Sequence, residues 1–383
     1  MRDGRMRVVV VGAGAWGLPA GAELAARGHD VVVLDAHGVG NRVSSSSGAT
    51  RLWRLAHPDA ARVRLALRSV AAWRRLEGAT GTELLLTRGL LWRDAGSVPA
   101  VADALASESV EHVAVDPGDV DRFFPGLRPN GIAAVWQPEA GPVLASAALS
   151  AAARRLAGAG GRLETARVVG IDTTGAHPVT VTTDHAQVLA ADRVVLAPGP
   201  WAPALLDLLG IDLPLAPVLE QVCYLGGTAD EDLPCWFEGP RDGEPGLYAM
   251  PTPGRGYKVG IDQPLRAFDP GDPAREASPR AADAIAARVA RDLPTVAADV
   301  TGCDVCSWTY SPDGRFVVDT VEDERVVLAC GDSGEGFKFS ALLGEVLADL
   351  AEGVRADPDV AGWSLARFGG APPMPERLPT LGV

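Results

Sequence analysis

The sequence predicts an α/β fold in which a domain with a parallel sheet and covering helices is interleaved with a mixed α+β domain. A β-branched strand, an amphipathic helix and a second strand open the chain, within residues 6–37. A strand that ends in Gly199 and a strand–helix pair over 325–353 have the same character. The stretch 217–310 is rich in Pro, Gly and Trp, as turn-rich sheets are. Parallel-sheet segments at both ends and in the middle imply two domains woven together.

The first three elements can be located from their residues. MRVVVVG at 6–12 is a β-branched run that ends in glycine, which is typical of a strand buried in a parallel sheet. A helix is expected over 13–28, because Pro19 lies in its first turns, where a missing N–H costs little, and Gly28 can cap its end. HDVVVLDAH at 29–37 is the second strand of this βαβ unit.

Later elements follow from similar patterns. After a polar loop at 38–54, an Arg-rich helix is expected to end near Glu77, and short strands and helices fill 80–140. The rest of the chain contains three more predicted helices and four stretches of predicted strand. The helices cover 144–161, 279–292 and 334–353, and the strands lie within 162–174, 177–199, 315–320 and 325–330.

Composition excludes several classes of function. The 383 residues are 47% hydrophobic and 22% charged, with a net charge of −14. The chain is long enough for two cores and shows no basic patch for nucleic acid or an anionic membrane surface. No signal peptide or uninterrupted apolar span is visible. The five cysteines are typical of a reducing compartment, so we expect a cytoplasmic protein with neither a membrane nor a nucleic-acid partner.

A glycine motif supplies the first candidate site. Gly12-x-Gly14-x-x-Gly17 follows the first strand and opens the helix, and Asp35 ends the second strand, 18 residues after Gly17. Small residues let the backbone approach a pyrophosphate, the helix start stabilises its charge, and the carboxylate accepts a hydrogen bond from a ribose hydroxyl. This context favours a Rossmann-like dinucleotide site over a glycine-rich turn without a ligand. The motif does not choose between NAD and FAD.

Three further segments favour FAD. RVVLAPGPWAP (193–203) is a strand that ends in Gly-Pro-Trp, SGATRLWR (47–54) is a loop just past the ribose position, and GDSGEGFKFS (331–340) is a glycine-rich helix start. A helix start there can stabilise the negative charge that reduction puts on a flavin; the alternative is a helix start with no ligand. The candidate cofactor contacts in these segments are Thr50, Arg51, Gly199, Trp201, Gly334, Gly336, Phe337 and Lys338, and Val168 in the predicted strand region 162–174 is a further one.

The chain resembles the FAD-dependent amine oxidoreductases of the D-amino-acid-oxidase and glycine-oxidase superfamily, within it the monomeric sarcosine oxidase and N-methyltryptophan oxidase group. Six segments carry this resemblance nearly end to end: GAGAWG with Asp35, SGATRLWR, GPWAPALL, LYAMPTPGRGYKVGID, CSWTYSPDGRFVVD and GEGFKFSALLGEVLADL. The resemblance implies bound FAD and oxidation of a C–N bond in an amino acid, an N-alkyl amino acid or a cyclic imino acid. It also implies hydride transfer to flavin N5 and reoxidation by O2, which yields H2O2.

The resemblance further implies residue roles. Lys258 matches the lysine over the flavin face that binds and activates O2, where a fixed cation stabilises superoxide-like charge. Lys338 and Arg54 match the pair that holds the substrate carboxylate. Arg51 matches an arginine beside the flavin ring, and Tyr248 matches an active-site tyrosine.

Cys306 matches the cysteine that carries FAD through a thioether to the flavin 8α-methyl group. Two alternatives stay open on the residues alone. Cys303-x-x-Cys306 has the spacing of a metal or redox pair, although no second ligand pair exists and all six histidines lie in the first 185 residues. Cys306 is otherwise a buried inert thiol. We expect FAD attached through Cys306, and no metal.

The lysine content supports the roles of two residues. Lys258 and Lys338 are the only two lysines in the sequence, and every other Lys or Arg position is an arginine. A surface lysine is usually a solvated charge, but here both fall in segments that match flavin-facing ones. An ammonium is more compact, better hydrated and more easily deprotonated than a guanidinium, so both are candidate catalytic residues.

The chain departs from the family pattern where the substrate is expected. Asp262 stands four residues after the O2 lysine, where sarcosine oxidases have a histidine, and Glu335 lies in a segment that usually reads Gly-Phe-Ser-Gly-His-Gly. The other departures are Ser47, Trp308 and Asp332. Because buried unpaired carboxylates are costly, Asp262 and Glu335 either pair with Arg51 or a lysine, or bind a cationic or N–H group of the substrate. Both alternatives disfavour sarcosine itself and favour a specialised biosynthetic substrate.

We expect an FAD-binding domain made of residues near 1–85, 145–215 and 310–383, and a substrate domain made of residues near 86–144 and 216–309. The active site is expected between them, on the flavin face. Three alternatives to an oxidase remain at this point. They are a flavin dehydrogenase of the same fold that passes electrons to another acceptor, an NAD-dependent dehydrogenase, and a non-catalytic flavin-binding regulator.

Overall fold

The computed structural model describes residues 4–175, 178–270, 275–355 and 358–369. Its first sheet has six strands in the order β19–β20–β12–β1–β2–β8. All neighbours pair in parallel except β19, which runs antiparallel to β20. The bounds are β1 (Arg7–Val11), β2 (Asp30–Asp35), β8 (Arg162–Thr165), β12 (Arg193–Leu196), β19 (Val317–Val321) and β20 (Val326–Cys330). The carboxyl ends of β1, β2, β12 and β20 therefore meet at one edge, where α/β sheets bind ligands.

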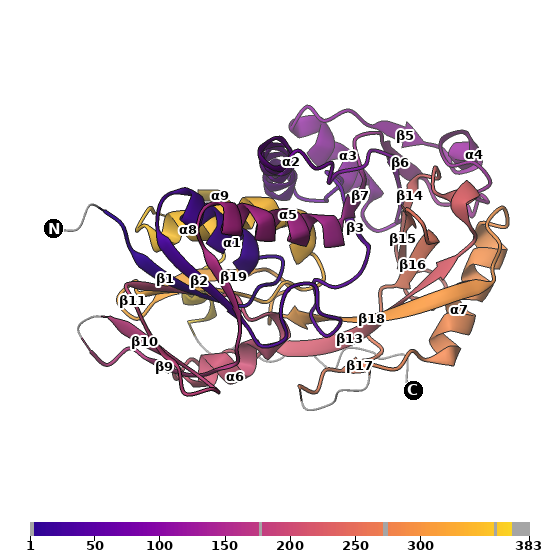
Figure 1. The fold of residues 1–383 in the computed structure, drawn as a ribbon. Helices are drawn as coiled ribbons and strands as arrows, with labels where there is room; N and C mark the ends of the chain where they lie inside the picture. Colours follow the sequence, from indigo (N-terminus) through magenta and orange to yellow (C-terminus); the bar gives the residue numbers. More distant parts are fainter. Residues whose placement is uncertain (1–3, 176–177, 271–274, 356–357, 370–383) are drawn as a thin grey trace.

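Two layers cover this sheet (Figure 1). Helices α1 (Gly17–Ala26), α5 (Ala145–Gly158) and α8 (Ser340–Ala351) pack on one face, and β9 (Val168–Asp172), β10 (Val179–Thr183), β11 (Val188–Ala191) and α6 (Ala202–Asp207) lie on the other. Residues of β1 alternate between the layers: Val8 and Val10 join the helical core, whereas Val9 and Val11 join the other. A strand buried on both faces needs apolar residues at every position, which explains the unbroken valine run.

The second sheet has nine strands. Eight of them follow the order β17–β13–β16–β15–β14–β4–β6–β5, and the ninth, β18, pairs with β13 along the edge opposite β16. Helix α7 (Pro279–Asp292) packs against it through Ile285 and Val289. Figure 1 shows β13 and β18 as two long neighbouring strands, which are antiparallel and extend between the first sheet and α7. The strand bounds are β4 (Leu90–Arg93), β5 (Val113–Val115), β6 (Ala134–Gln137), β13 (Ala216–Leu225), β14 (Cys235–Glu238), β15 (Leu247–Thr252), β16 (Gly256–Ile261), β17 (Arg266–Ala267) and β18 (Val300–Tyr310).

Two smaller groups of elements connect the sheets. A two-stranded ribbon pairs β3 (Thr50–Trp53) with β7 (Gly141–Leu144). Helix α2 (Ala60–Thr80) begins at the N-cap Asp59 and ends at Gly81, which has a left-handed φ of 61°. The short helices α3 (Val98–Ser107), α4 (Val120–Phe123) and α9 (Pro358–Ala361) complete the described chain. No helix within that part of the chain is both long and apolar enough to cross a bilayer.

Most of the predicted elements are present, and two predicted helix starts are wrong. The first helix begins at Gly17 rather than at residue 13, after a turn that follows Gly12. The last begins at Ser340 rather than near residue 334, because 331–335 form a turn and η4 (Gly336–Phe339) is a single 3-10 turn. Gly331, Ser333 and Gly334 have φ values of 68°, 45° and 76°, which no right-handed helix accommodates.

The two sheets draw their strands from different parts of the chain. Strands of the six-stranded sheet come from residues 7–35, 162–196 and 317–330, and strands of the nine-stranded sheet come from 90–137 and 216–310. We keep the two interleaved domains as a proposal. Residues 370–383, the carboxyl-terminal end of the expected FAD-binding domain, lie outside the described residues.

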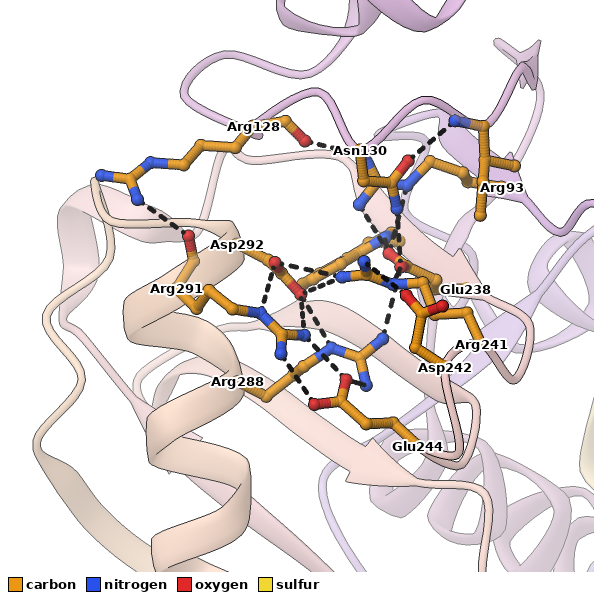
Figure 2. A network of polar contacts seen from close by, with 12 residues as sticks. Arg93, Arg128, Asn130, Glu238, Arg241, Asp242, Glu244, Arg288, Arg291 and Asp292 are labelled. Atoms are coloured by element: carbon orange, nitrogen blue, oxygen red, sulfur yellow. Dashed lines mark hydrogen bonds and ion pairs between the residues drawn. The ribbon is translucent and has the colours of Figure 1, made fainter.

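A buried ionic network joins α7 to the second sheet (Figure 2). Glu238 at the end of β14 accepts hydrogen bonds from Arg93 Nε and Nη2 at 3.1 and 2.6 Å, and both side chains are fully buried. Asp292 at the end of α7 pairs with Arg288 at 2.7 Å and with Arg241 at 3.0 Å. The other members are Arg128, Asn130, Asp242, Glu244 and Arg291. Breaking such a pair leaves an uncompensated buried charge, which typically costs about 3–5 kcal/mol.

Candidate active site

One cavity of about 600 Å3 lies where the two sheets meet, at the carboxyl edge of the parallel strands. Its walls include residues that follow β1, β2, β12 and β20, together with residues of β15, β16 and β18. Most predicted site residues line it. They are Gly12, Gly14, Asp35, Arg51, Arg54, Val168, Gly199, Trp201, Tyr248, Lys258, Asp262, Cys306, Gly334, Glu335, Gly336, Phe337 and Lys338.

Two predicted cofactor contacts, Gly17 and Thr50, are not among the lining residues. A Cβ on Gly17 would lie 2.0 Å from the carbonyl oxygen of Gly12, so this glycine is needed for close packing of α1 on β1. The hydroxyl of Thr50 shares a hydrogen bond of 2.7 Å with Thr252, inside the protein. Neither residue faces the cavity, and both stabilise its wall through packing or hydrogen bonding inside the protein.

The glycine turn after β1 is shaped for close approach of a ligand. Gly12 has a φ of 102°, and a Cβ there would lie 2.2 Å from the carbonyl oxygen of Ala197, so no other residue fits without movement. Asp35 is oriented by the backbone: its Oδ2 accepts from Ala13 N at 2.8 Å and its Oδ1 from His37 N at 2.9 Å. The rings of His37 and Trp201 lie 5.3 Å apart beside it. This arrangement suits the nucleotide end of a dinucleotide.

Arg51 is held by backbone carbonyls rather than by a carboxylate. Its guanidinium donates to the oxygens of Ser45, Ser47 and Thr50, the first at 2.8 Å and the last at 2.9 Å. Its Cζ lies 5.7 Å from the centre of the Phe337 ring. The positive charge of Arg51 is therefore located in the cavity wall, and within the part of the chain that the structure describes neither Asp262 nor Glu335 pairs with it.

Glu335 joins the two residues predicted to bind a substrate carboxylate. Its Oε1 accepts from Arg54 Nη2 at 2.9 Å and from Lys338 Nζ at 3.1 Å, while its Oε2 accepts from Arg62. Burial opposes the charge of Glu335, but Lys338, Arg54 and the other neighbours outweigh it and hold the pKa of this carboxyl well below its usual range. The open question about Glu335 is answered: it pairs internally.

Arg54 and Lys338 are both buried, with 8% of each residue exposed. Burial lowers the pKa of Arg54 to about 10, partly opposed by Glu335, and lowers the pKa of Lys338 to about 7, again opposed by Glu335. Arg54 also stacks at 4.6 Å over the ring of Trp92, which itself lies 3.7 Å from the ring of Phe237. His57 Nδ1 faces Arg54 Nη1 at 3.0 Å. The position of Arg54 is therefore fixed on several sides.

Lys258 lies on the other side of the cavity, on β16. It is 2% exposed, and its Nζ donates to the carbonyl oxygen of Thr50 at 2.7 Å. Burial, followed by the charge of Arg51, lowers the pKa of Lys258 to about 7. The amine of Lys258 is therefore partly protonated at neutral pH, and it is held in a fixed position away from bulk water.

Asp262 and Asp332 differ in what they contact. The Asp262 side chain opens onto the cavity and makes no hydrogen bond or ion pair with any described residue. Desolvation in the cavity, followed by the charge of Glu335, raises the pKa of its carboxyl. Asp332 instead accepts from Thr309 N at 3.0 Å, and burial raises its pKa to about 6. Asp332 holds the 331–335 turn, whereas Asp262 is open to a ligand.

Sequence reasoning missed several residues of this site. Arg62 is one of many arginines in α2, so nothing in the pattern singles it out as the partner of Glu335. Glu220 is the clearest omission, because it interrupts an otherwise apolar buried strand, APVLEQVCYL, and that lone charge was a usable signal. Its Oε1 accepts from Tyr248 OH at 2.6 Å. No cluster of three metal-ligating side chains occurs among the described residues.

These residues fit a bound FAD. Gly12, Gly14 and the start of α1 suit the pyrophosphate, and Asp35 suits a ribose hydroxyl. Arg51, Lys258 and the glycine turn before η4 suit the flavin end. The cavity that joins these parts is continuous.

The family model for FAD dependent oxidoreductases matches residues 7–350. The chain belongs to this family. The oxidoreductase is 31% identical over 378 residues to the monomeric sarcosine oxidase of Bacillus sp. (strain B-0618), covering 94% of this chain and 95% of that relative. It is 27% identical to the N-methyl-L-tryptophan oxidase of Yersinia pestis (strain Pestoides F), covering 94% of this chain and 99% of the other.

Solved structures agree with the family assignment. The oxidoreductase superposes with a TM-score of 0.84, at 28% identity, on the open form of NikD, described as an unusual amino acid oxidase essential for nikkomycin biosynthesis. That match covers 94% of this chain and 97% of NikD. Glycine oxidase from Geobacillus kaustophilus has the same fold, with a TM-score of 0.79 at 24% identity and coverage of 95% and 99%. The predicted fold class and family are therefore confirmed.

Proposed function

We propose that this chain is an FAD-dependent oxidase of the C–N bond in an amino acid, an N-alkyl amino acid or a cyclic imino acid. The observation that carries this proposal is the grouping of Arg54, Lys258 and Lys338 around one cavity with the carboxylates Asp262 and Glu335. Relatives named for oxidation of sarcosine, N-methyl-L-tryptophan and an unusual amino acid support the substrate class. When bound, FAD supplies the acceptor for a hydride from the carbon next to nitrogen, and O2 reoxidises it to give H2O2.

Arg54 and Lys338 are the proposed anchors of the substrate carboxylate. With Lys338 protonated, the three cations Arg54, Arg62 and Lys338 face the single charge of Glu335, which leaves a net charge of 3 − 1 = +2. A substrate carboxylate is therefore attracted even while Glu335 stays in place, held by Arg62. The anchors contribute mainly position, since the reacting carbon must lie at near-attack distance from its acceptor.

Lys258 is the proposed residue for O2. Its ammonium is fixed on the carbonyl of Thr50 and shielded from water, so its charge acts in a medium of low dielectric constant. A fixed cation stabilises the negative charge that develops on oxygen when the first electron arrives. Only the protonated form of Lys258 can do this.

Asp262 is the proposed contact for a cationic or N–H group of the substrate. Its carboxylate has no internal partner and faces the cavity that also holds the carboxylate anchors. A charge-assisted hydrogen bond to such a group typically contributes about 1.5–3 kcal/mol. This is the sharper of the two alternatives that the sequence left open for Asp262, and it favours a specialised biosynthetic substrate over sarcosine.

We further propose that FAD is held covalently, through a thioether from Cys306 to the flavin 8α carbon. Cys306 lines the cavity on β18 and is not part of a metal cluster among the described residues. The same strand carries Trp308, which also lines the cavity. A cytoplasmic location remains a proposal that the cysteine content supports.

The test is an anaerobic screen in which bleaching of the flavin absorbance reports substrate oxidation. The panel contains N-methyl amino acids, cyclic imino acids, diamino acids and amines without a carboxylate. We expect bleaching by carboxylate-containing amines, followed by H2O2 release in air. Bleaching without H2O2 would instead identify a dehydrogenase that uses another acceptor, and no bleaching by any member would reject the proposed activity.

A further inference from the structure

Glu220 does not itself line the cavity, but it lies directly opposite Cys306 in the antiparallel pair of β13 and β18. Residues opposite each other in such a pair project to the same face, with Cβ atoms about 4.5–5.5 Å apart. Cys306 lines the cavity, and Glu220 is 1% exposed. The carboxyl of Glu220 and the thiol of Cys306 are therefore neighbours on the cavity side of the sheet.

Only one oxygen of the Glu220 carboxyl has a partner. Oε1 accepts from Tyr248 OH at 2.6 Å, whereas Oε2 is buried without a hydrogen-bond partner among the described residues. A buried charged oxygen without a partner is costly. Burial, followed by the charge of Cys306, accordingly raises the pKa of Glu220 well above its usual range. Oε2 is thus a site where a proton is favoured.

Glu220 is the carboxylate directly opposite Cys306, and the groups around it leave Oε2 able to accept a proton. Burial and then Glu220 raise the pKa of Tyr248 well above its usual range, so its phenol keeps its proton and remains a donor. Lys258 favours the charged form of Glu220, and Asp262 disfavours it. The titratable groups that face Glu220 are Tyr248, Lys258, Asp262, Cys306 and Tyr310.

We propose that Glu220 accepts the thiol proton of Cys306 when this cysteine forms its bond to FAD. This inference rests on the covalent attachment proposed above. The S–H bond would break with its proton passing to Oε2 of Glu220, and Sγ would bond to the 8α carbon, which would lose one hydrogen as a proton. FAD would supply the two-electron oxidant for this step, with O2 as the final acceptor. The two electrons would leave to O2 together with the 8α proton and the proton that Glu220 releases, which gives H2O2 and returns Glu220 to its starting form. A buried carboxylate whose pKa is raised is a stronger base than an exposed one, and it accepts such a proton more readily.

The experiment measures covalent incorporation of FAD into the full-length protein, prepared free of flavin from riboflavin-starved cells. FAD is added, samples are precipitated with acid at intervals, and the protein-bound flavin is quantified by fluorescence and intact mass. Glu220→Gln keeps the size and the Tyr248 contact and removes the base. Asp304→Asn is the matched control, since Asp304 lies two residues before Cys306 and pairs instead with Tyr224 and Arg255.

We expect covalent incorporation to be at least about 100-fold slower in Glu220→Gln, the lower range for loss of a general base. Reversible FAD binding should be unchanged, and Asp304→Asn should incorporate FAD within about threefold of wild type. An equal rate in Glu220→Gln and wild type would overturn the inference. Failure of the wild-type protein itself to attach FAD would instead reject the thioether, without touching the proposed oxidation of substrates by reversibly bound FAD.

A second variant keeps the inference testable if Glu220→Gln does not fold. The hydrogen bond from Tyr248 lowers the pKa of Glu220, so Tyr248→Phe leaves Glu220 protonated up to a higher pH. The rising limb of the pH profile of covalent incorporation should then shift to higher pH in Tyr248→Phe. A profile that coincides with that of wild type would contradict a role for Glu220 as the base.

Discussion

The oxygen reaction should depend on the protonation of Lys258. Burial and Arg51 lower the pKa of this lysine to about 7, so its positive charge is present below that pH and is lost as the pH rises through it. With a midpoint near 7, about half of the molecules carry the charge at pH 7 and about 1% at pH 9. The rate constant for reoxidation should therefore fall by about 50-fold between these two pH values.

The assay is stopped-flow reoxidation of photoreduced enzyme with O2 from pH 6 to pH 10, which separates this step from substrate binding. Lys258→Met should be slower by about 100-fold or more at pH 6 and independent of pH, because it lacks the cation. Lys258→Arg stays protonated throughout and should show no alkaline fall. A wild-type rate constant that varies by less than about threefold over this range, or a Met variant as fast as wild type, would refute the reasoning.

Four other predictions address binding and stability. Arg54→Met should weaken binding of a carboxylate inhibitor by about 10- to 100-fold, equivalent to the loss of one charge-assisted hydrogen bond, as measured by perturbation of the flavin spectrum; unchanged affinity would exclude Arg54 as an anchor. Asp262→Asn should weaken a substrate with a second cationic group far more than its neutral analogue, and equal losses would show a merely structural effect. Gly12→Ala should abolish FAD binding, since its Cβ would lie 2.2 Å from the oxygen of Ala197, and a variant purified with full flavin content would contradict this. Glu238→Gln should cost about 3–5 kcal/mol and lower the melting temperature by several degrees, whereas Asp242→Asn, at the exposed rim of the same network, should change it little.

The fold was largely predictable because its main signals are local. The valine runs of β1 and β2 and the amphipathic pattern of α7 are each contained within a few consecutive residues. The start of α8 was not predictable in the same way. Gly331, Ser333 and Gly334 adopt left-handed backbone angles that close a turn on the cavity, and helix propensity does not report them.

The sequence predicted which residues belong to the candidate site, but not which of them pair with one another. The glycine motif, the scarcity of lysine and the family resemblance together identified site residues of which most line the cavity. Pairing depends on contacts between distant segments: Glu335 meets Arg62 across 273 residues, and Glu220 faces Cys306 through sheet register. No periodicity in the sequence encodes such contacts, so the internal neutralisation of Glu335 and the isolation of Asp262 required the structure.

The pairing of β4 with β14 has a consequence for how substrate preference can change. Trp92 is in register with Phe237, and Arg93 with Glu238, so neighbouring positions of the same two strands point to opposite faces. One face supplies the aromatic stack beneath Arg54, and the other supplies the ion pair that leads to α7. A substitution near α7 that shifts this strand pair by a fraction of an ångström would tilt the aromatic rings and move the guanidinium. Because Arg54 is the proposed substrate anchor, we expect substitutions near α7 to change substrate preference from positions outside the cavity.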